Sequence, residues 1–376
     1  MNRRQLLGRA LLGAGAAAAV ACGGGGGRGG EAEGGAGAPA VQTRRRLRWR
    51  LASSFPRGMD TIFGASEVLA ERVAALTEGR FEIRVYPAGE LVPGLQVLDA
   101  VQQGTVQIGQ SASYYYTGKN PALAFDTCVP FGLDTRLQNA WLEEGGGRAA
   151  VDRLLADFSA LSLLAGGTGA QMGGWFRRPI GSLADLRGLK MRIPGLGGEV
   201  MSRLGVTVQV LAGGDIYPAL ERGAIDATEW VGPYDDEKLG FHKIARNYYY
   251  PGWWEPGPAL SFYVGRRAWD SLPAAYRDAL RAAAREAASA MQTRYDARNG
   301  EALRRLLAAG VELRPFPRDV MAAARRTAED LFAESARGDA AFRAVYEPWR
   351  TFRERAFAWF GTAELAYADF VYPRPA

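Results

Sequence analysis

The chain of 376 residues carries 46 lysines and arginines against 40 aspartates and glutamates, a formal net charge of +6, and 48% of it is hydrophobic. This length is too great for one small domain, so we expect two lobes with proper cores. No stripe of Lys and Arg with interleaved aromatic residues occurs, which argues against nucleic-acid binding. The single histidine, His242, excludes His-rich metal sites, and we expect it to be a surface or packing residue.

Residues 1–22 have the features of an export signal, because a charged start precedes an Ala/Leu-rich run and small residues before Cys22. Arg3-Arg4 followed by Gln5-Leu6-Leu7 resembles a twin-arginine signal, which predicts an extracytoplasmic, periplasmic destination. Ala19-Val20-Ala21-Cys22 resembles a lipobox, and cleavage there would make Cys22 the lipidated first residue. A plain signal with an incidental cysteine is the alternative.

Residues 23–45 begin with a glycine-rich run that cannot bury enough apolar surface to fold, so we expect a flexible tether. With Cys22 assigned to the leader, Cys128 remains alone, and the mature fold therefore contains no internal disulfide. Beyond the leader, no segment is expected to span a bilayer.

Strand and helix patterns then alternate, which predicts an α/β sheet with crossover helices. In chain order we expect a strand around Leu47–Leu51, a helix from Ile62 to Leu76 closed by Gly79, a strand at Phe81–Val85, a helix at Gly94–Gln103 and a strand at Val106–Ile108.

A second block of the same kind begins near Leu161. We expect a strand at Leu161–Leu164, a glycine-rich turn, a helix at Ser182–Arg187, a strand at Met191–Ile193, and a short helix capped by Asp215 with Pro218 in its first turn. The C-terminal third is predicted to be helical over about 273–309 and 318–365. One compact lobe would struggle to bury that much amphipathic helix, so we expect part of it to pack against a partner.

Arg192 is a candidate ligand-binding residue, because it ends a predicted strand in a place where α/β sheets collect ligands. Its planar guanidinium suits a carboxylate held through two hydrogen bonds. Pairing with a structural acid is an equally good interpretation of the spacing. Gln171, just after the glycine-rich turn, is a second candidate, and its amide could serve a ligand, a cation or only its own loop.

Glu229 shares one face of a predicted strand with Ile225, Ala227 and Val231. A carboxylate in that apolar position needs a cation or several hydrogen-bond donors, because an isolated buried charge is costly. Trp230 faces the other way and could form an apolar wall.

Asp235, Asp236 and Glu237 follow Gly232-Pro233-Tyr234, which indicates the entry to a helix. Acidic residues in a first turn complement the helix dipole, so we expect these three to be structural.

The chemistry these residues predict is binding rather than catalysis. No nucleophile has a candidate base, and neither HExxH, CxxC nor GxxxxGK[ST] occurs. A carboxylate, a glutamine and a backbone carbonyl would make an all-oxygen site for Na⁺ or Ca²⁺. The alternative is a secreted enzyme that acts on small carboxylates through Glu229 and a neighbouring acid.

From about Trp49 to its end, the chain resembles the periplasmic solute-binding subunit of tripartite ATP-independent periplasmic (TRAP) transporters of the DctP type. It is most similar to the branch that binds 2-oxo acids such as pyruvate or 2-hydroxy acids such as lactate. The segments that carry the resemblance are Phe81–Pro93, Thr168–Arg177, Gly188–Gly195, Ala212–Gly240 and Tyr248–Gly257.

The resemblance implies a two-lobed, type II-like periplasmic binding protein with a ligand cleft between its lobes and a long C-terminal helical segment. It implies lobe I at 46–168 with part of 258–310 returning to it, lobe II at 169–257, and C-terminal helices for packing and homodimerisation at 311–376.

The resemblance also assigns residues to the site. Arg192 is expected to pair with the substrate carboxylate, with Tyr115 and Thr168 among the substrate-binding residues. A bridging Na⁺ or Ca²⁺ is expected to be held by Gln171, Glu229, the carbonyl of Trp230 and Glu255, which places Gln171, Glu229 and Trp230 against the substrate too. Gly167 stands where a relative has asparagine, which leaves the bonding of the oxo or hydroxy group open.

We therefore expect a non-enzymatic receptor that captures a small monocarboxylate together with a metal ion and delivers it to TRAP permease subunits in the membrane. Coupling of the same binding fold to a sensor is the remaining alternative.

Overall fold

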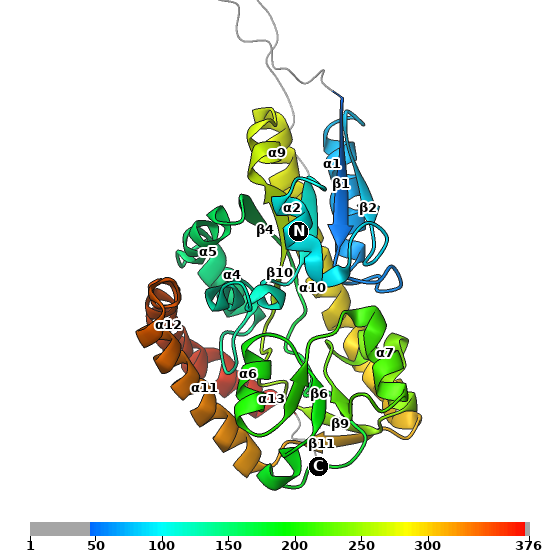
Figure 1. The fold of residues 1–376 in the computed structure, drawn as a ribbon, viewed down its shortest axis with the longest axis vertical. Coiled ribbons are helices and arrows are strands. Elements are labelled where there is room, and N and C mark those ends of the chain that lie inside the picture. The colour runs from blue at the N-terminus through cyan, green and yellow to red at the C-terminus, as the bar shows by residue number, and fades with distance from the viewer. Residues whose placement is uncertain (1–45, 373–376) are drawn as a thin grey trace, which may run out of the picture. The chain divides into compact units, whose positions relative to one another are not determined.

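The computed structural model describes residues 46–372, and the expected export signal and tether lie outside that range, as do the last four residues. The described chain forms two mixed β-sheets flanked by helices, which confirms the α/β prediction (Figure 1). Within residues 46–372, no helix is long and apolar enough to cross a membrane, and Cys128 is a free, buried thiol.

The first sheet contains five strands in the order β2 (Phe81–Tyr86), β1 (Leu47–Ser53), β3 (Ile108–Ser111), β10 (Ala259–Gly265) and β4 (Ala160–Gly167). Strands β1, β2 and β3 are parallel and are joined through α1 (Gly64–Leu76), then η1 (Gly94–Gln96) and α2 (Val97–Gln102). This is the expected β-α-β-α-β run. Gly109 lets α2 pack closely on β3, because a Cβ there would lie 2.4 Å from Val97 Cγ1. Strand β10 returns antiparallel from much later in the chain.

The second sheet contains six short strands in the order β11 (Glu312–Pro315), β9 (Asn247–Tyr250), β5 (Trp175–Phe176), β8 (Ala227–Thr228), β6 (Lys190–Arg192) and β7 (Thr207–Gln209). Its helices are α6 (Gly195–Arg203), α7 (Gly213–Glu221) and α8 (Pro233–Leu239). Segment 312–315, placed among the C-terminal helices by the resemblance, is therefore a strand of this sheet. Backbone hydrogen bonds hold this strand against β9, from Glu312 N to Arg246 O (2.8 Å) and from Phe316 N to Tyr250 O (2.9 Å).

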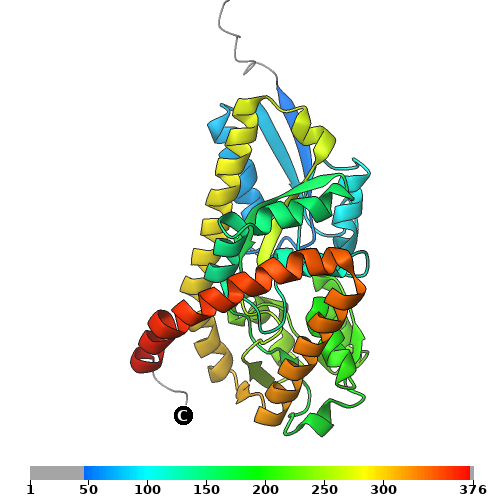
Figure 2. The same ribbon diagram turned by 90° about the vertical axis from the view of Figure 1, so that its left-hand side faces the viewer.

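Helix α10 (Ala274–Ala308) connects the two halves of the structure, because it packs on α1 and β4 of the first half and on α8 of the second (Figure 2). The shorter helices are α3 (Ala124–Thr127), α4 (Thr135–Glu143), α5 (Gly147–Ala156), α9 (Arg266–Asp270), η2 (Ser113–Tyr116), η3 (Pro121–Leu123), η4 (Leu183–Leu186) and η5 (Phe241–Lys243).

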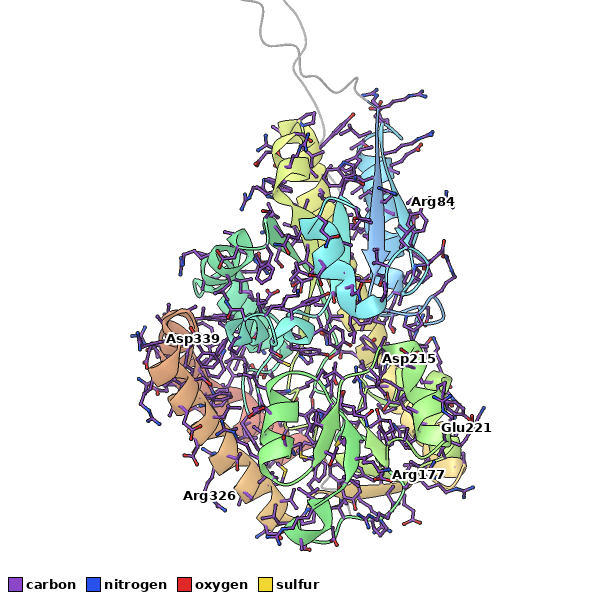
Figure 3. The ribbon with its side chains drawn as sticks, viewed as in Figure 1. Arg84, Arg177, Asp215, Glu221, Arg326 and Asp339 are labelled. Atoms are coloured by element: carbon purple, nitrogen blue, oxygen red, sulfur yellow. The ribbon has the colours of Figure 1, made fainter. Side chains whose placement is uncertain are left out.

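The C-terminal segment is α11 (Arg318–Gly338), α12 (Ala340–Phe360), the π-helical turn η6 (Gly361–Leu365) and α13 (Ala366–Val371). The prediction that 318–365 is helical is confirmed, and the structure adds a break where the chain turns at Asp339 (Figure 3). Asp339 adopts an extended conformation, and its carboxylate accepts hydrogen bonds from Ala341 N (2.7 Å) and Phe342 N (3.1 Å). It therefore caps the start of α12.

Three local predictions in the second half were wrong. The helix expected at Ser182–Arg187 is only the 3₁₀ turn η4, closed by a capping box between Ser182 and Asp185. Helix α7 begins before Asp215, at Gly213, where a Cβ would lie 2.6 Å from the Trp230 ring. Pro218 therefore falls inside the helix rather than in its first turn. The strand expected over 225–231 pairs only at Ala227–Thr228, so Glu229 lies just beyond a strand end.

The acids at the start of α8 fix that helix in place. Asp235 is buried and accepts hydrogen bonds from Thr61 (2.8 Å) and from Tyr295 on α10 (2.7 Å). Asp236 is buried and accepts from the Trp175 indole (2.9 Å) and the Tyr248 hydroxyl (2.8 Å).

Glu237 pairs with Arg305 at 2.7 Å, so all three acids have structural partners, as expected. Their role extends beyond the helix dipole, because these bonds join α8 to α10 and to the first half of the structure.

We predict that Asp236→Asn changes how stability depends on pH. Burial raises the pKa of Asp236 from 3.8 to about 7, against the hydrogen bonds from Trp175 and Tyr248. Between these values the folded protein keeps a proton that the unfolded chain has released, so the free energy of unfolding falls as pH rises from about 4 to 7 and is then level. Only the part of this fall between pH 5 and pH 7 lies between measurements at pH 5 and pH 8, about 2.7 kcal/mol. Urea unfolding at these two pH values should therefore show a fall in the wild type that is smaller by about that amount in Asp236→Asn, where the raised pKa of Glu229 still contributes.

The control is Asp215→Asn, which alters an exposed acid on α7 and should leave the free energy of unfolding within about 0.5 kcal/mol of wild type at both pH values (Figure 3). Parallel curves for wild type and Asp236→Asn would contradict the prediction.

Candidate functional site

Arg192 ends strand β6 in the second half of the structure and is 1% exposed. Its Nε donates to Leu211 O (3.1 Å), its Nη1 donates to the carboxylate and the backbone oxygen of Glu229, and its Nη2 donates to the Tyr115 hydroxyl (3.4 Å). The guanidinium also lies 5.4 Å from the ring centroid of Trp230. Burial alone would lower the pKa of Arg192, but the Glu229 carboxylate and nearby tyrosines raise it above its usual value, so the residue stays charged.

Glu229 is fully buried immediately after strand β8. One carboxylate oxygen accepts from Arg192, whereas Oε2 has no hydrogen-bond partner within residues 46–372. Burial raises the pKa of Glu229 to about 7, although Arg192 opposes the shift. The spacing left open whether Arg192 binds a ligand or pairs with a structural acid. Both are compatible, because the acid that it pairs with, Glu229, lies in the candidate site itself.

Glu255 brings a second buried carboxylate into this region from the loop between β9 and β10. Its Oε2 accepts a hydrogen bond from the Tyr114 hydroxyl at 3.2 Å. Burial, followed by repulsion from Glu229, raises the pKa of Glu255 well above its usual range. Two nearby carboxylates that share one arginine leave this part of the protein short of positive charge.

Gln171 lies in the loop between β4 and β5 and is 4% exposed. Its Nε2 donates to Thr168 Oγ1 (3.3 Å), and its Oε1 is buried without a partner within residues 46–372. Its backbone N–H donates to Glu255 O at 3.2 Å, so the two loops are bonded to each other. These loops are two of the connections between the sheets, which places Gln171 and Glu255 where the halves of the structure join (Figure 1).

A small cavity lies between the two halves. The space in it that the centre of a water molecule can occupy is about 10 Å³. It is lined by Phe55, Ile62, Tyr114, Tyr115, Thr168, Gln171, Arg192, Trp230, Val231 and Leu260. The structure therefore brings five of the sequence-predicted site residues to one cavity and places Glu229 and Glu255 directly behind its lining.

Sequence reasoning missed the apolar part of this wall, formed by Phe55, Ile62 and Leu260. Phe55 could have been found, because it follows the end of parallel strand β1, where ligands of α/β sheets collect. Leu260 arrives from a late antiparallel strand, which no local pattern indicates.

Gly167 does not face this cavity. A Cβ built there would lie 2.5 Å from Thr135 Cγ2 and 2.7 Å from Gln292 Oε1, so any larger side chain at this position would press on α4 and α10. The departure from asparagine noted in the sequence therefore affects packing behind the site.

The oxygen atoms at the site fit a hard cation. The free Oε1 of Gln171, the free Oε2 of Glu229 and the carboxylate of Glu255 are the ligand types that Na⁺ and Ca²⁺ prefer. Within residues 46–372, no three His, Cys, Asp or Glu side chains form a metal cluster, so a cation here would depend on amide and carbonyl oxygens as well.

His242 lies outside the site, partly buried in η5, with its ring 6.4 Å from that of Trp175. Burial lowers its pKa. His242 is the packing residue that was expected. It does not line the cavity at Arg192, so it cannot act there as a base for a nucleophile.

Comparisons with known proteins identify the family of the chain. Residues 53–339 match the family model of bacterial extracellular solute-binding protein, family 7 (DctP). A monocarboxylate 2-oxoacid-binding periplasmic protein of Nostoc sp. is 58% identical over 86% of this chain and 89% of its own length.

Three solved TRAP solute-binding proteins are also similar. One from Bordetella bronchiseptica, a dimer with copurified calcium and picolinate in one site, has 47% identity and a TM-score of 0.86 over 87% of this chain and 97% of its own. One from Colwellia psychrerythraea, with calcium and pyruvate, has 38% identity and a TM-score of 0.84 over 86% and 99%. One from Pseudoalteromonas atlantica, with sodium and pyruvate, has 40% identity and a TM-score of 0.84 over 88% and 100%.

The family match covers more than half of the chain, and the relatives share its two-sheet fold and its long C-terminal helices. They are binding proteins, which excludes the enzymatic alternative built on Glu229. The chain is thus a periplasmic solute-binding protein that belongs to the DctP family, family 7 of the bacterial extracellular solute-binding proteins, whose members serve TRAP transporters.

Proposed function

We propose that this protein captures a small 2-oxo monocarboxylate, with pyruvate as the reference ligand, together with Na⁺ or Ca²⁺. The observation that carries the proposal is the buried Arg192 guanidinium, which lines a cavity and contacts one of two carboxylates that lack full compensation. Solved relatives that hold pyruvate with calcium or sodium support the same ligand class.

Arg192 pairs with the ligand carboxylate in this proposal. Its guanidinium is already fixed by Leu211 O and by Glu229, so it loses little freedom when it binds a carboxylate. Tyr115 and Thr168 contribute hydroxyl groups from the opposite half and from the connecting loop.

The side chains of Gln171, Glu229 and Glu255 and the carbonyl of Trp230 hold the cation. When bound, that ion would neutralise the carboxylates and offer a coordination position to the ligand's C2 oxygen. Arg192, Glu229 and Glu255 together carry −1 with both acids ionised, and a monocarboxylate makes the sum −2. A divalent ion balances that sum, and a monovalent ion balances it if one acid keeps its proton, which the raised pKa values of both acids favour.

The size of the cavity limits the ligand. Phe55, Ile62 and Leu260 close the space in front of Arg192 with apolar groups, which leave a second carboxylate without a partner. We therefore propose pyruvate-sized 2-oxo acids as preferred ligands. Lactate, which presents a hydroxyl at the same carbon, is a second candidate, and dicarboxylates are disfavoured.

Entry of a ligand requires the two halves to separate, because so little space is open between them. We propose that lobe I (46–168 with part of 258–310) and lobe II (169–257) close over the ligand, with Gln171 and Glu255 on the connections that bend. The closed protein would deliver its ligand to a TRAP permease, and coupling to a sensor is the alternative. Export through a twin-arginine signal and anchoring through Cys22 complete the proposal.

The C-terminal helices support a homodimer. Several large apolar side chains of these helices are exposed to solvent. The exposed fractions are 62% for Trp359, 64% for Leu365, 66% for Tyr367 and 91% for Phe370. A run of this kind is typical of a protein–protein interface, and a similar protein was crystallised as a dimer.

We predict that Arg192→Gln weakens pyruvate binding at least about a hundredfold, because the ligand carboxylate would be buried without its charged partner. Isothermal titration calorimetry in the presence of calcium measures the effect. The matched control, Arg178→Gln, changes an exposed arginine of the same half and should bind as wild type does. Unchanged affinity in a folded Arg192→Gln protein would remove Arg192 from the site.

Glu229→Gln should weaken pyruvate binding about tenfold or more, and added calcium should no longer strengthen it, because a neutral amide holds a cation poorly. Titrations of chelator-treated protein with and without calcium or sodium measure the dependence. Glu221→Gln on the outer surface of α7 is the control (Figure 3). Equal pyruvate affinity with and without cations in the wild type would contradict the cation site.

For the dimer, we expect the double variant Trp359→Glu, Phe370→Glu to sediment as a monomer where the wild type sediments as a dimer, because two charges cannot be buried in an apolar interface. Analytical ultracentrifugation at tens of micromolar distinguishes the two. Arg326→Glu, on the exposed face of α11, should remain dimeric (Figure 3). A monomeric wild type would refute the proposal.

A further inference from the structure

A second hollow, of about 320 Å³, lies on the first half of the structure, away from the candidate ligand site. It is bounded by the outer edge of β4 and by α4, α5, α9 and α10, and it shares no lining residue with the cavity at Arg192. Strand β4 is the last strand of its sheet, so its free edge faces this hollow.

Positive charge gathers around the hollow. Its lining includes Arg148, Arg266, Arg281 and Arg285, and its acids are Glu143 and Asp152. The sum over these six lining residues is +2 with both acids ionised. Two further acids lie just outside the lining, because Arg148 pairs with Asp126 and Arg281 pairs with Asp278.

One of these arginines has no acid partner. The guanidinium of Arg266 makes no hydrogen bond or ion pair within residues 46–372, whereas Arg285 pairs with Glu143 at 3.3 Å. Arg281 lies over the Trp269 ring, 4.7 Å from its centroid, and pairs with Asp278 at 3.3 Å.

Buried donors without partners distinguish this hollow from a solvated group of surface arginines. Ser162 on β4 is 2% exposed, and its Oγ has no hydrogen-bond partner within residues 46–372. Nη2 of Arg148 is likewise buried and unpartnered, while Nη1 of the same guanidinium is fixed by the buried Asp126 at 3.4 Å. Unsatisfied buried donors are uncommon, and these two belong to residues that line the same positively charged hollow.

We propose that this hollow is a binding site for a small oxyanion with two or more negative charges, such as phosphate or a dicarboxylate. The planar forks of the arginines suit such an anion, and the Ser162 hydroxyl supplies a neutral donor on its inner side. The volume admits one small ligand rather than a peptide. This site is independent of the proposed 2-oxo acid site, because none of its residues takes part there.

Isothermal titration calorimetry with inorganic phosphate, and separately with malonate, tests the proposal in metal-free buffer of low ionic strength. The titrations use wild type and Arg192→Gln, so that an anion held in the cavity at Arg192 is recognised. We expect one saturable site in both proteins. Whichever of phosphate and malonate binds with the higher affinity indicates whether the natural ligand is a phosphate or a dicarboxylate.

Ser162→Ala is the sharpest variant. Because the Ser162 hydroxyl has no partner in the protein, its removal should leave the thermal stability of the anion-free protein unchanged while weakening anion binding about tenfold. Arg266→Gln should weaken anion binding at least as much. The matched control is Arg267→Gln, the neighbouring exposed arginine that does not line the hollow, and pyruvate binding should stay at the wild-type level in all three variants.

Three results would overturn the proposal: no saturable binding of phosphate or malonate, loss of that binding in Arg192→Gln, or equal weakening in Arg267→Gln and Arg266→Gln. The last outcome would indicate only a diffuse effect of surface charge.

Discussion

The ion pair between Arg192 and Glu229 is excluded from water, with at most 1% of either side chain exposed, and a second carboxylate, Glu255, lies near it. Removing such charges from water costs several kcal/mol for each ion, so the pair persists only where other groups fix it. Leu211 O, the Tyr115 hydroxyl and the Trp230 ring hold the guanidinium. The carboxylates lack equivalent support, and both therefore have raised pKa values.

The architecture explains how such an arrangement is kept. Strand β6 delivers Arg192 from the second sheet, while the loops that connect the sheets deliver Gln171 and Glu255. Helix α10 runs along both halves, and bonds from Tyr295 to Asp235 and from Trp175 and Tyr248 to Asp236 fix α8 beside it. Arg192 therefore comes from a sheet whose helix α8 is fixed by buried hydrogen bonds, and Gln171 and Glu255 come from the junction of the halves.

Under the proposed function, low exposure favours a single carboxylate. Such a ligand would meet a fixed guanidinium where the effective dielectric constant is low, so a matched charge would gain more there than at the surface. An additional ligand charge would find no second arginine or lysine in the lining, part of which is formed by apolar groups such as Phe55 and Leu260. The proposed anion site near Ser162 differs, because there the buried groups without partners are the Ser162 hydroxyl and one nitrogen of Arg148, while Arg281 and Arg285 are exposed.

The sequence by itself determined the alternating strands and helices of the first sheet, the strand-end position of Arg192 and the residue types of the site, because local periodicity and turn chemistry act over a few residues. It also indicated that Glu229 needs a cation or several hydrogen-bond donors. Tertiary structure alone decided that this partner is Arg192, that Glu255 lies against Tyr114, and that the chain turns at Asp339. These facts depend on contacts between segments far apart in the chain and on the exclusion of water around them, and no local pattern encodes either.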